Sequence, residues 1–453
     1  MRRWGVVVAA FVALVGALVV VRVYDASSAE PTEPTRPVAK KRPTTCEGDP
    51  GWVATWASGV GELPPGAPRR DGFANETLRQ VVHVTLGGSA VRVTLTGPTD
   101  GPALQVDAAT VALAAQAQGA GPGLQPGTRR PLTFAGGART VRIAPGQRLV
   151  SDPVNLTVPD DHDLVVSLYF AHPTGPPAGH VYGGETSWVG PGNLVDVDAG
   201  PEFRGRGGQP LVAYPFVPSY FVTGVDVVAR GAANITVLGD SISDGYGFIW
   251  PPDHQLVASE QLFQRLAAHK PRCLAVTNVA LAGNPLLELR HGWAPGPNTG
   301  VGRLDRDVLD RSGLRVLVVA LGTNDIAVGG RSAEEVVLAL ESIIDRAHAA
   351  GVRVVGATIP PLTNVGQPPD PEVELARRAI NARIRPTSPG ALEFDSVLDM
   401  ELALQDRRHP GRIDPRYSGC AFGSCGQWHP GPAGHRAVAQ AFDLDRLRKL
   451  AGQ

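Results

Sequence analysis

The chain has 453 residues, of which 43% are hydrophobic, 19% charged and 6% aromatic, and its formal net charge is −1. This composition excludes a wholly disordered or collagen-like chain. The near-neutral charge gives no electrostatic reason to expect a nucleic acid or an acidic polymer as partner. At about 150 residues per domain, the length allows up to about three domains.

The first residues indicate export. Arg2 and Arg3 precede an uncharged, mostly apolar run over residues 4–21, which Arg22 ends. A basic flank before an apolar core is typical of a signal peptide, yet this run also reaches the lower limit of a single membrane span. Residues 1–29 are therefore predicted to be either a cleaved signal peptide or a retained N-terminal anchor. Either way, the protein would be secreted or tethered to the outer face of the cytoplasmic membrane.

Residues 30–49 are rich in proline and threonine and cannot bury a core. Such a composition is typical of an extended spacer between a membrane or wall and a folded part.

The chain has four cysteines, and an even number in an exported chain favours disulfides. The short separation of Cys420 and Cys425 makes them one predicted pair, which leaves Cys46 and Cys273 as the other. Zinc binding by Cys420 and Cys425 is the rival interpretation, but no second pair of ligands at a suitable spacing accompanies them.

Residues 50–230 show a β pattern. Polar and apolar residues alternate over 78–86 and 90–95 on either side of Gly87 and Gly88, which predicts a half-buried hairpin. Further short strands are predicted over 140–143, 154–158 and 164–169. Together they predict an antiparallel sandwich of jelly-roll type. Its aromatic residues form either a stacking surface for a glycan or part of the core: Trp52, Trp56, Tyr182 and Trp188.

Residues 231–453 show a different pattern, in which buried strands alternate with helices. Strands are predicted over 234–238, 315–321 and 352–357, and a helix over 333–350. This alternation predicts a parallel sheet with helices on both faces. Ligands of such sheets bind at the carboxyl ends of the strands.

Four residues near these strand ends carry the functional groups of acyl transfer. Ser241 follows the first strand, Gly283 follows an apolar run, Asn324 follows the second predicted strand, and His429 precedes a closing helix. They supply a hydroxyl nucleophile, an imidazole base, and amide donors for a developing oxyanion. Asp240 and Asp325, beside two of them, are predicted to bind loop amides.

With Ser, Gly, Asn and His in this order, residues 232–453 resemble the SGNH (GDSL-type) esterases and lipases. The region over 50–230 is similar to the β-rich segment that precedes this domain in exported actinobacterial members, most clearly at 52–56 and 78–80. The resemblance implies a three-layer parallel-sheet hydrolase domain over 231–453 after a sandwich domain over 50–230. It also implies that Ser241 is the nucleophile and His429 the base. The oxyanion would bind the backbone amides of Ser241 and Gly283 and the side chain of Asn324.

The sequence departs from this family at one position. An aspartate usually stands three residues before the histidine and orients its ring, but here the residue is Gly426. Two replacements are open: a backbone carbonyl, which would leave a Ser-His dyad, or a more distant acid such as Asp414. In serine proteases, changing the orienting acid lowers kcat by about 10⁴.

The sequence thus predicts an exported hydrolase of small-molecule, lipid or glycan esters, with possible glycan contact through the sandwich domain. Two alternatives are an O-acyltransferase on the same site and a non-catalytic carbohydrate-binding protein. No phosphate-binding loop, dinucleotide fingerprint or paired-histidine zinc motif is present in the sequence, so neither a cofactor nor a metal is expected.

Overall fold

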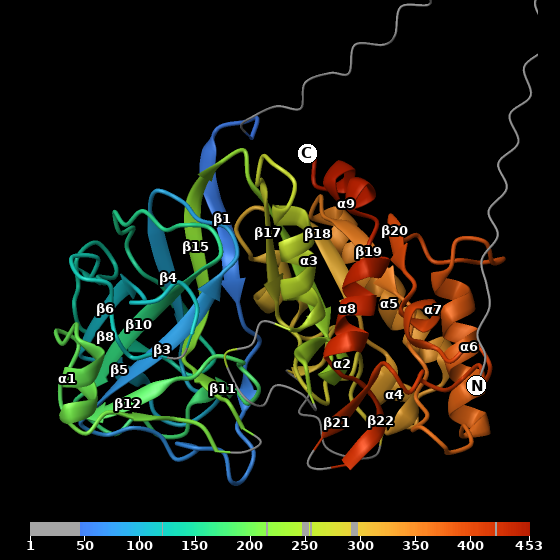
Figure 1. The fold of residues 1–453 in the computed structure, drawn as a ribbon, viewed down its shortest axis with the longest axis horizontal. Coiled ribbons are helices and arrows are strands. Elements are labelled where there is room, and N and C mark those ends of the chain that lie inside the picture. The colour runs from blue at the N-terminus through green and yellow to red at the C-terminus, as the bar shows by residue number, and fades with distance from the viewer. Residues whose placement is uncertain are drawn as a thin grey trace, which may run out of the picture. The chain divides into compact units, whose positions relative to one another are not determined.

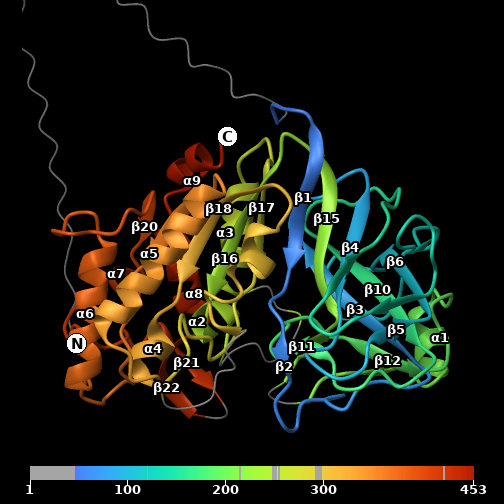
Figure 2. The same ribbon diagram turned by 180° about the vertical axis from the view of Figure 1, so that it is seen from behind.

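The computed structural model describes residues 46–119, 121–213, 216–246, 253, 256–290, 298–421 and 424–453. The predicted signal or anchor (1–29) and most of the predicted spacer (30–49) lie outside these residues. Within the described ranges, no helix is long and apolar enough to cross a membrane. Figures 1 and 2 show a β-rich half and an α/β half from opposite sides.

The β-rich half contains two larger antiparallel sheets (Figure 1). The four strands of the first sheet are, in spatial order, β1 (Pro50–Ala57), β15 (Val222–Arg230), β4 (Val91–Thr96) and β9 (Arg148–Val150). The six of the second are β13 (Gln209–Pro210), β12 (Trp188–Pro191), β3 (Glu76–Val84), β10 (His162–Phe170), β6 (Ala108–Leu113) and β7 (Arg130–Pro131).

Two smaller sheets and one helix complete this half. They are β14 (Ser219–Tyr220), β11 (Ala178–His180) and β2 (Gly61–Glu62); β5 (Leu104–Val106) with β8 (Val141–Ile143); and α1 (Gly200–Gly205). The larger sheets share one core, to which β4 contributes Val93 and Leu95 and β3 contributes Leu78 and Val82. The predicted antiparallel sandwich is therefore confirmed.

The predicted hairpin over 78–95 is wrong. Its two strands, β3 and β4, lie in different sheets: β3 pairs with β10 and β12, whereas β4 pairs with β15 and β9. The alternating polar residues of β3 misled the prediction because they are buried, with Arg79 and Gln80 both at 0% exposure. The guanidinium of Arg79 donates to backbone carbonyls, including that of Leu194 at 3.2 Å, so polar residues here do not mark a solvent face.

The predicted strand over 154–158 is also wrong, because Val154 and Val158 form only isolated bridges. Val154 bridges Val91, and Val158 bridges Gly88, so this segment follows the edge of the sandwich without forming a continuous ladder.

The α/β half is built on a five-stranded parallel sheet (Figure 2). Its spatial order is β17 (Leu274–Asn278), β16 (Ala233–Gly239), β18 (Leu314–Ala320), β19 (Arg353–Ala357) and β20 (Ser396–Leu398). The other elements are α2 (Ser241–Asp244), α3 (Ala258–Ala267), a π-helix (Asp305–Leu309), α4 (Thr323–Ala327), α5 (Ala333–Ala349), α6 (Pro371–Ile384), α7 (Met400–Leu404), β21 (Ser418–Ala421), β22 (Ser424–Pro430), α8 (Pro432–Ala441) and α9 (Leu444–Leu450).

Helices cover both faces of this sheet, as predicted. On β18, Leu317 and Val319 belong to the core formed with α5 and α6, whereas Val316 and Val318 belong to the core formed with α3, α8 and α9. Successive strand residues point to opposite faces, and both faces here are apolar, as expected of a buried parallel sheet. The result is the three-layer arrangement that the sequence predicts.

The two halves are joined by buried hydrogen bonds and by a disulfide. The side-chain amide of Asn234, on β16, donates to the carbonyl of Ala54, on β1, over 2.9 Å. The hydroxyl of Thr85 donates to the carbonyl of Val276, on β17, over 3.2 Å. Cys46, just before β1, forms a disulfide with Cys273, just before β17. Residues from Pro43 to the C-terminus accordingly form one compact unit.

Candidate active site

Ser241 lies where β16, an inner strand of the parallel sheet, ends. β16 runs to Gly239, and Ser241 begins the short helix α2. The carboxylate of Asp240 accepts the backbone N–H of Ile242 at 3.0 Å and so caps this helix. Burial raises the pKa of Asp240 to about 7. A side chain at Gly239 would lie 2.6 Å from the side chain of Ser243, so the tight turn requires glycine there.

His429 reaches Ser241 from a hairpin near the C-terminus. It lies on β22, which pairs with β21, and the disulfide between Cys420 and Cys425 joins the two strands. Nε2 of His429 lies 2.9 Å from Oγ of Ser241, within hydrogen-bonding distance. The structure therefore brings together the predicted nucleophile and the predicted base, which are 188 residues apart in the sequence.

Aromatic rings surround the imidazole of His429. The ring of Trp428 stacks on it with centroids 4.0 Å apart, and the ring of Tyr246 lies 4.7 Å away and tilted by 47°. Burial lowers the pKa of His429 to about 4, because the charged form loses its hydration. At neutral pH the ring is therefore uncharged and able to accept a proton.

No acid among the described residues forms a hydrogen bond with His429. Gly426 has a φ of +83°, and its carbonyl accepts the N–H of Val365 at 2.7 Å. Asp414 binds Arg416 instead, with 2.6 Å between a carboxylate oxygen and the guanidinium, and this ion pair lowers the pKa of Asp414. In this structure the carboxylate of Asp414 is thus engaged by an arginine.

Of the three predicted oxyanion donors, Gly283 lies in a loop, whereas Ser241 and Asn324 lie in the short helices α2 and α4. Gly283 has a φ of +77°, is exposed, and a side chain added there would meet no atom within 4 Å. Of the four N–H groups over 281–284, those of Leu281, Ala282 and Asn284 donate to protein acceptors. Within the described ranges, no hydrogen bond uses the N–H of Gly283 or of Ser241.

Asn324 lies at the start of α4, directly after β18. Its side-chain amide donates to the carbonyl of Asn284 over 3.1 Å, which leaves the second N–H of the same amide for an oxyanion. The carboxylate of Asp325 accepts the N–H groups of Leu286 and Leu287 at 2.8 and 3.0 Å. Asp240 and Asp325 thus bind loop amides, as predicted.

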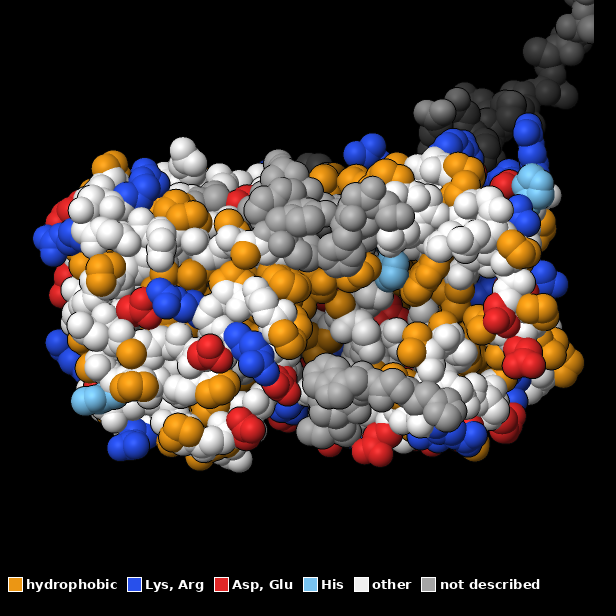
Figure 3. All heavy atoms as spheres, turned by 90° about the horizontal axis from the view of Figure 1, so that it is seen from below, with side chains coloured by type: hydrophobic (Ala, Val, Ile, Leu, Met, Phe, Trp, Pro, Cys, Tyr) orange, Lys and Arg blue, Asp and Glu red, His pale blue; other side chains and the backbone are white. Residues whose placement is uncertain are grey.

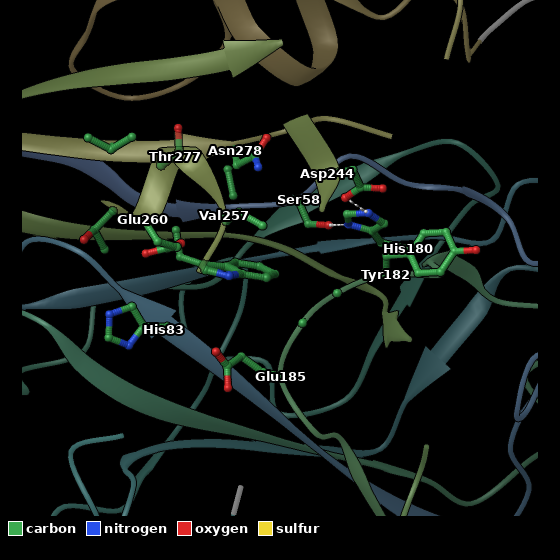
Figure 4. Close-up of a pocket in the computed structure, with 16 residues that line it drawn as sticks. Ser58, His83, His180, Tyr182, Glu185, Asp244, Val257, Glu260, Thr277 and Asn278 are labelled. Atoms are coloured by element: carbon green, nitrogen blue, oxygen red, sulfur yellow. Dashed lines mark hydrogen bonds and ion pairs between the residues drawn. The ribbon is translucent and has the colours of Figure 1, made fainter. Parts of the chain in front are cut away.

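Two hollows lie between the β-rich half and the α/β half. One, of about 140 Å³, is lined by Gly283 and Asn284 on one side and by Glu62 and His180 on the other. The other, of about 80 Å³, lies between Glu185 and Glu260 and is also lined by His180 (Figure 4). Figure 3 shows apolar side chains gathered around a hollow near the middle of the face that carries β21 and β22.

A second serine, histidine and aspartate are aligned beside these hollows. Oγ of Ser58 lies 2.9 Å from Nδ1 of His180, whose Nε2–H donates to Asp244 over 2.8 Å (Figure 4). The hydroxyl of Ser58 also lies 2.9 Å from the carbonyl of Gly59, and Ser58 is only 3% exposed. Inspection of the sequence missed these residues, because nothing in their spacing relates Ser58 or His180 to Asp244.

The four aromatic residues considered for glycan stacking are distributed over the β-rich half. Trp188 and Tyr182 are buried, and Tyr182 packs edge-on against Tyr246. Trp52 lies under the guanidinium of Arg92, at 4.5 Å. Trp56 lines the smaller hollow. No three His, Cys, Asp or Glu side chains are arranged to hold a metal ion in the part of the chain that the structure describes.

Comparisons with known proteins agree with this fold. Residues 237–437 match the model of the GDSL-like lipase/acylhydrolase family. A search of curated proteins gave no match. A family two carbohydrate esterase from Clostridium thermocellum, solved in complex with cellohexaose, is 15% identical with a TM-score of 0.35, over 89% of this chain and 99% of that one. A carbohydrate acetylesterase family member from Sinorhizobium meliloti is 17% identical with a TM-score of 0.36, over 49% of this chain and all of that one.

The parallel sheet and the family match define a carboxylic ester hydrolase of the SGNH type. Residues 237–437, within the α/β half, form a GDSL-like lipase/acylhydrolase domain. The TM-scores of the two solved structures are below 0.5, so we take no substrate from them.

Proposed function

We propose that this protein hydrolyses carboxylic esters through an acyl-enzyme, with Ser241 as nucleophile and His429 as general base. The observation that carries the proposal is the 2.9 Å separation between Oγ of Ser241 and Nε2 of His429 at the carboxyl end of β16. A nucleophile within hydrogen-bonding reach of a base is the arrangement that activates a serine hydroxyl.

In the first half of the reaction, Oγ of Ser241 attacks the ester carbonyl carbon while its proton moves to Nε2 of His429. The tetrahedral intermediate collapses, the carbon–oxygen bond to the alcohol breaks, and His429 returns the proton to the leaving oxygen. In the second half, His429 takes a proton from water, which attacks the acyl-enzyme. The carboxylic acid leaves, and Ser241 recovers its proton.

The negative charge on the carbonyl oxygen would be held by the N–H groups of Ser241 and Gly283 and by the free amide N–H of Asn324. Each such donor contributes about 3–4 kcal/mol to the transition state in known oxyanion holes. The left-handed backbone and open surroundings of Gly283, which lines the larger hollow, support this role.

We further propose that Ser241 and His429 act as a dyad. Asp414 is bound to Arg416, and the aromatic rings around His429 supply packing instead of charge. The ring would then be oriented by Trp428 and Tyr246 and by the Cys420–Cys425 hairpin, which carries it.

Export is a separate part of the proposal. Its basis is the basic and apolar pattern over residues 1–29, with which the two disulfides are compatible. Expression in a bacterial host, followed by fractionation and N-terminal sequencing, distinguishes a cleaved signal from a retained anchor. Recovery of the full-length chain in the cytoplasm would contradict export.

The test of the activity is hydrolysis of p-nitrophenyl acetate and butyrate by the purified chain. We expect turnover by the wild type and none above background with Ser241→Ala, at an unchanged melting temperature. Turnover that does not depend on Ser241 would refute the proposal. A panel of acyl chain lengths, lipid esters and acetylated polysaccharides then identifies the substrate class, and ester formation that exceeds hydrolysis with an added alcohol would indicate acyl transfer.

A further inference from the structure

Beyond the proposed dyad, the structure contains a hydrogen-bonded chain that links the β-rich half to the loop of Gly283. We infer that His180 is a positioning residue, which acts through Asp244 to hold the oxyanion-binding loop in place. This inference rests on the proposed function, because it assigns Gly283 to the oxyanion hole.

Asp244 connects the hydrogen-bonded residues of the β-rich half to the loop of Gly283. It ends helix α2, three residues after Ser241, and is 4% exposed. One carboxylate oxygen accepts Nε2–H of His180 at 2.8 Å, and the other accepts the backbone N–H of Ala282, also at 2.8 Å. A single carboxylate therefore connects the nucleophile helix, the residue next to Gly283, and the β-rich half.

The hydrogen bond to Ala282 helps to fix the orientation of the next peptide group. Leu281 donates its N–H to the carbonyl of Gly239 over 3.1 Å, and Asn284 donates its N–H to the carbonyl of Leu281 over 3.0 Å. With Ala282 bound to Asp244, the left-handed turn at Gly283 is held on both sides. Among the described residues, no protein acceptor binds the N–H of Gly283 itself.

His180 supports this carboxylate from the other half of the molecule. It lies on β11 and is 7% exposed, and Ser58 fixes its ring through Nδ1 over 2.9 Å. Figure 4 shows Ser58, His180 and Asp244 in line at one end of the smaller hollow. A buried carboxylate with two partners has a defined orientation, and loss of one partner leaves it free to turn toward water or to take up a proton.

The types of residue are those of a catalytic triad, but their arrangement does not suit catalysis. Ser58 is almost fully buried, and its hydroxyl lies within hydrogen-bonding distance of the carbonyl of Gly59. The carboxylate of Asp244 faces Ala282 and the loop of the larger hollow, which Ala282 and Gly283 line. The hydrogen bonds of Ser58, His180 and Asp244 therefore fix the loop of Gly283 relative to the β-rich half. They do not supply a second nucleophile.

Misplacement of a catalytic group by about 1 Å can lower a rate about a hundredfold. We therefore expect His180→Leu to lower kcat by about 10-fold to 100-fold with KM changed less than about threefold, since the oxyanion develops only in the transition state. His180→Gln should recover most of kcat, because its side-chain amide can still donate to Asp244. Asp244→Asn should lower kcat at least as much as His180→Leu, because an amide N–H would then face either His180 or Ala282.

Arg92→Met is the matched control. Arg92 also joins the two halves, through a 2.8 Å hydrogen bond to Ser312, but Ser312 precedes β18 and so lies at the opposite end of the sheet from Ser241. We expect this variant to lower the melting temperature without changing kcat.

The experiment measures kcat, KM and melting temperature for these variants, and hydrogen exchange of a peptide that spans 279–286. Faster exchange in His180→Leu, slow exchange in His180→Gln and Arg92→Met, and the expected order of kcat values would support the inference. An unchanged exchange rate of this peptide in folded His180→Leu, or equal losses of kcat in His180→Leu and Arg92→Met, would overturn it. If the wild type shows no Ser241-dependent turnover, the proposed function fails, and the exchange rates still decide whether His180 positions the loop.

Discussion

His83 is buried and His429 is half-buried, and their surroundings shift their pKa values in opposite directions. Burial lowers the pKa of His429 to about 4. Burial also opposes the charge of His83, but hydrogen bonds to Asp161 and Asp163 outweigh it and raise the pKa to about 10. A base that must be neutral lies among aromatic rings, whereas a structural cation lies between carboxylates. The two histidines therefore differ in their surroundings and not in residue type, and these surroundings distinguish the imidazole proposed as catalytic from the structural one.

The largest expected effect comes from removing the catalytic imidazole. His429→Ala should lower kcat by about 10⁴ or more, since the nucleophile then has no base. His83→Gln should leave kcat within about threefold of the wild type. Steady-state kinetics on p-nitrophenyl acetate measure both, and a comparable loss in the two variants would remove the distinction between these histidines.

Removing the structural cation should instead reduce stability. His83→Gln leaves Asp163, at 0% exposure, without its charged partner, and breaking a buried ion pair costs about 3–5 kcal/mol. Because the folded-state pKa is raised, the stabilisation by His83 is complete below about pH 6.5 and is lost as the pH rises through about 10. Urea unfolding at pH 6 and pH 9.5 should show this decline in the wild type and a smaller one in His83→Gln. Parallel declines in the two proteins would contradict the assignment.

Supplying the absent acid should not help His429. Gly426 has a φ of +83°, and a residue with a side chain in this left-handed region costs roughly 1–2 kcal/mol. We expect Gly426→Asp to be destabilised by about that amount, with no gain in kcat. Gly426→Ala is the control for strain alone. If Gly426→Asp raised kcat over Gly426→Ala, the dyad would be limited by its lack of an acid.

Much of this site follows from the sequence, and the part that does not has a physical reason. Ser241, Asn324 and His429 each lie close to the end of a strand or the start of a helix, which apolar patterns reveal, and Gly283 follows the apolar run of β17. The roles of His180 and Asp244 depend on contact between the two halves, which no local pattern encodes. The β3–β4 hairpin was mispredicted for a similar reason, because His83 and Arg79 are buried by partners that are distant in the sequence.

The fall of kcat/KM at low pH tests whether the surroundings of His429 lower its pKa. With its pKa lowered to about 4, the imidazole stays neutral and active at pH 5.5, whereas a base with an ordinary pKa of about 6.5 would retain roughly a tenth of its activity there. We expect kcat/KM to fall only as the pH approaches 4. A midpoint near 6.5 under conditions where the protein remains folded would show that Trp428 and Tyr246 do not dehydrate the ring.

The smallest effect is expected at Asp414, and it decides between the two replacements for the absent acid. The carboxylate of Asp414 forms an ion pair with the guanidinium of Arg416, and the backbone carbonyl of Asp414 accepts the N–H of Ser418 at the start of β21. Asp414→Ala removes only the side chain from this turn, so kcat should stay within about twofold. Asp414 itself is buried, but its partner Arg416 is exposed to solvent, so loss of the ion pair should lower stability by about 1 kcal/mol. A loss of several hundredfold in kcat, with an unchanged melting temperature, would mean that Asp414 turns toward His429 during catalysis. The protein would then be a triad hydrolase whose acid is held by Arg416 in this structure.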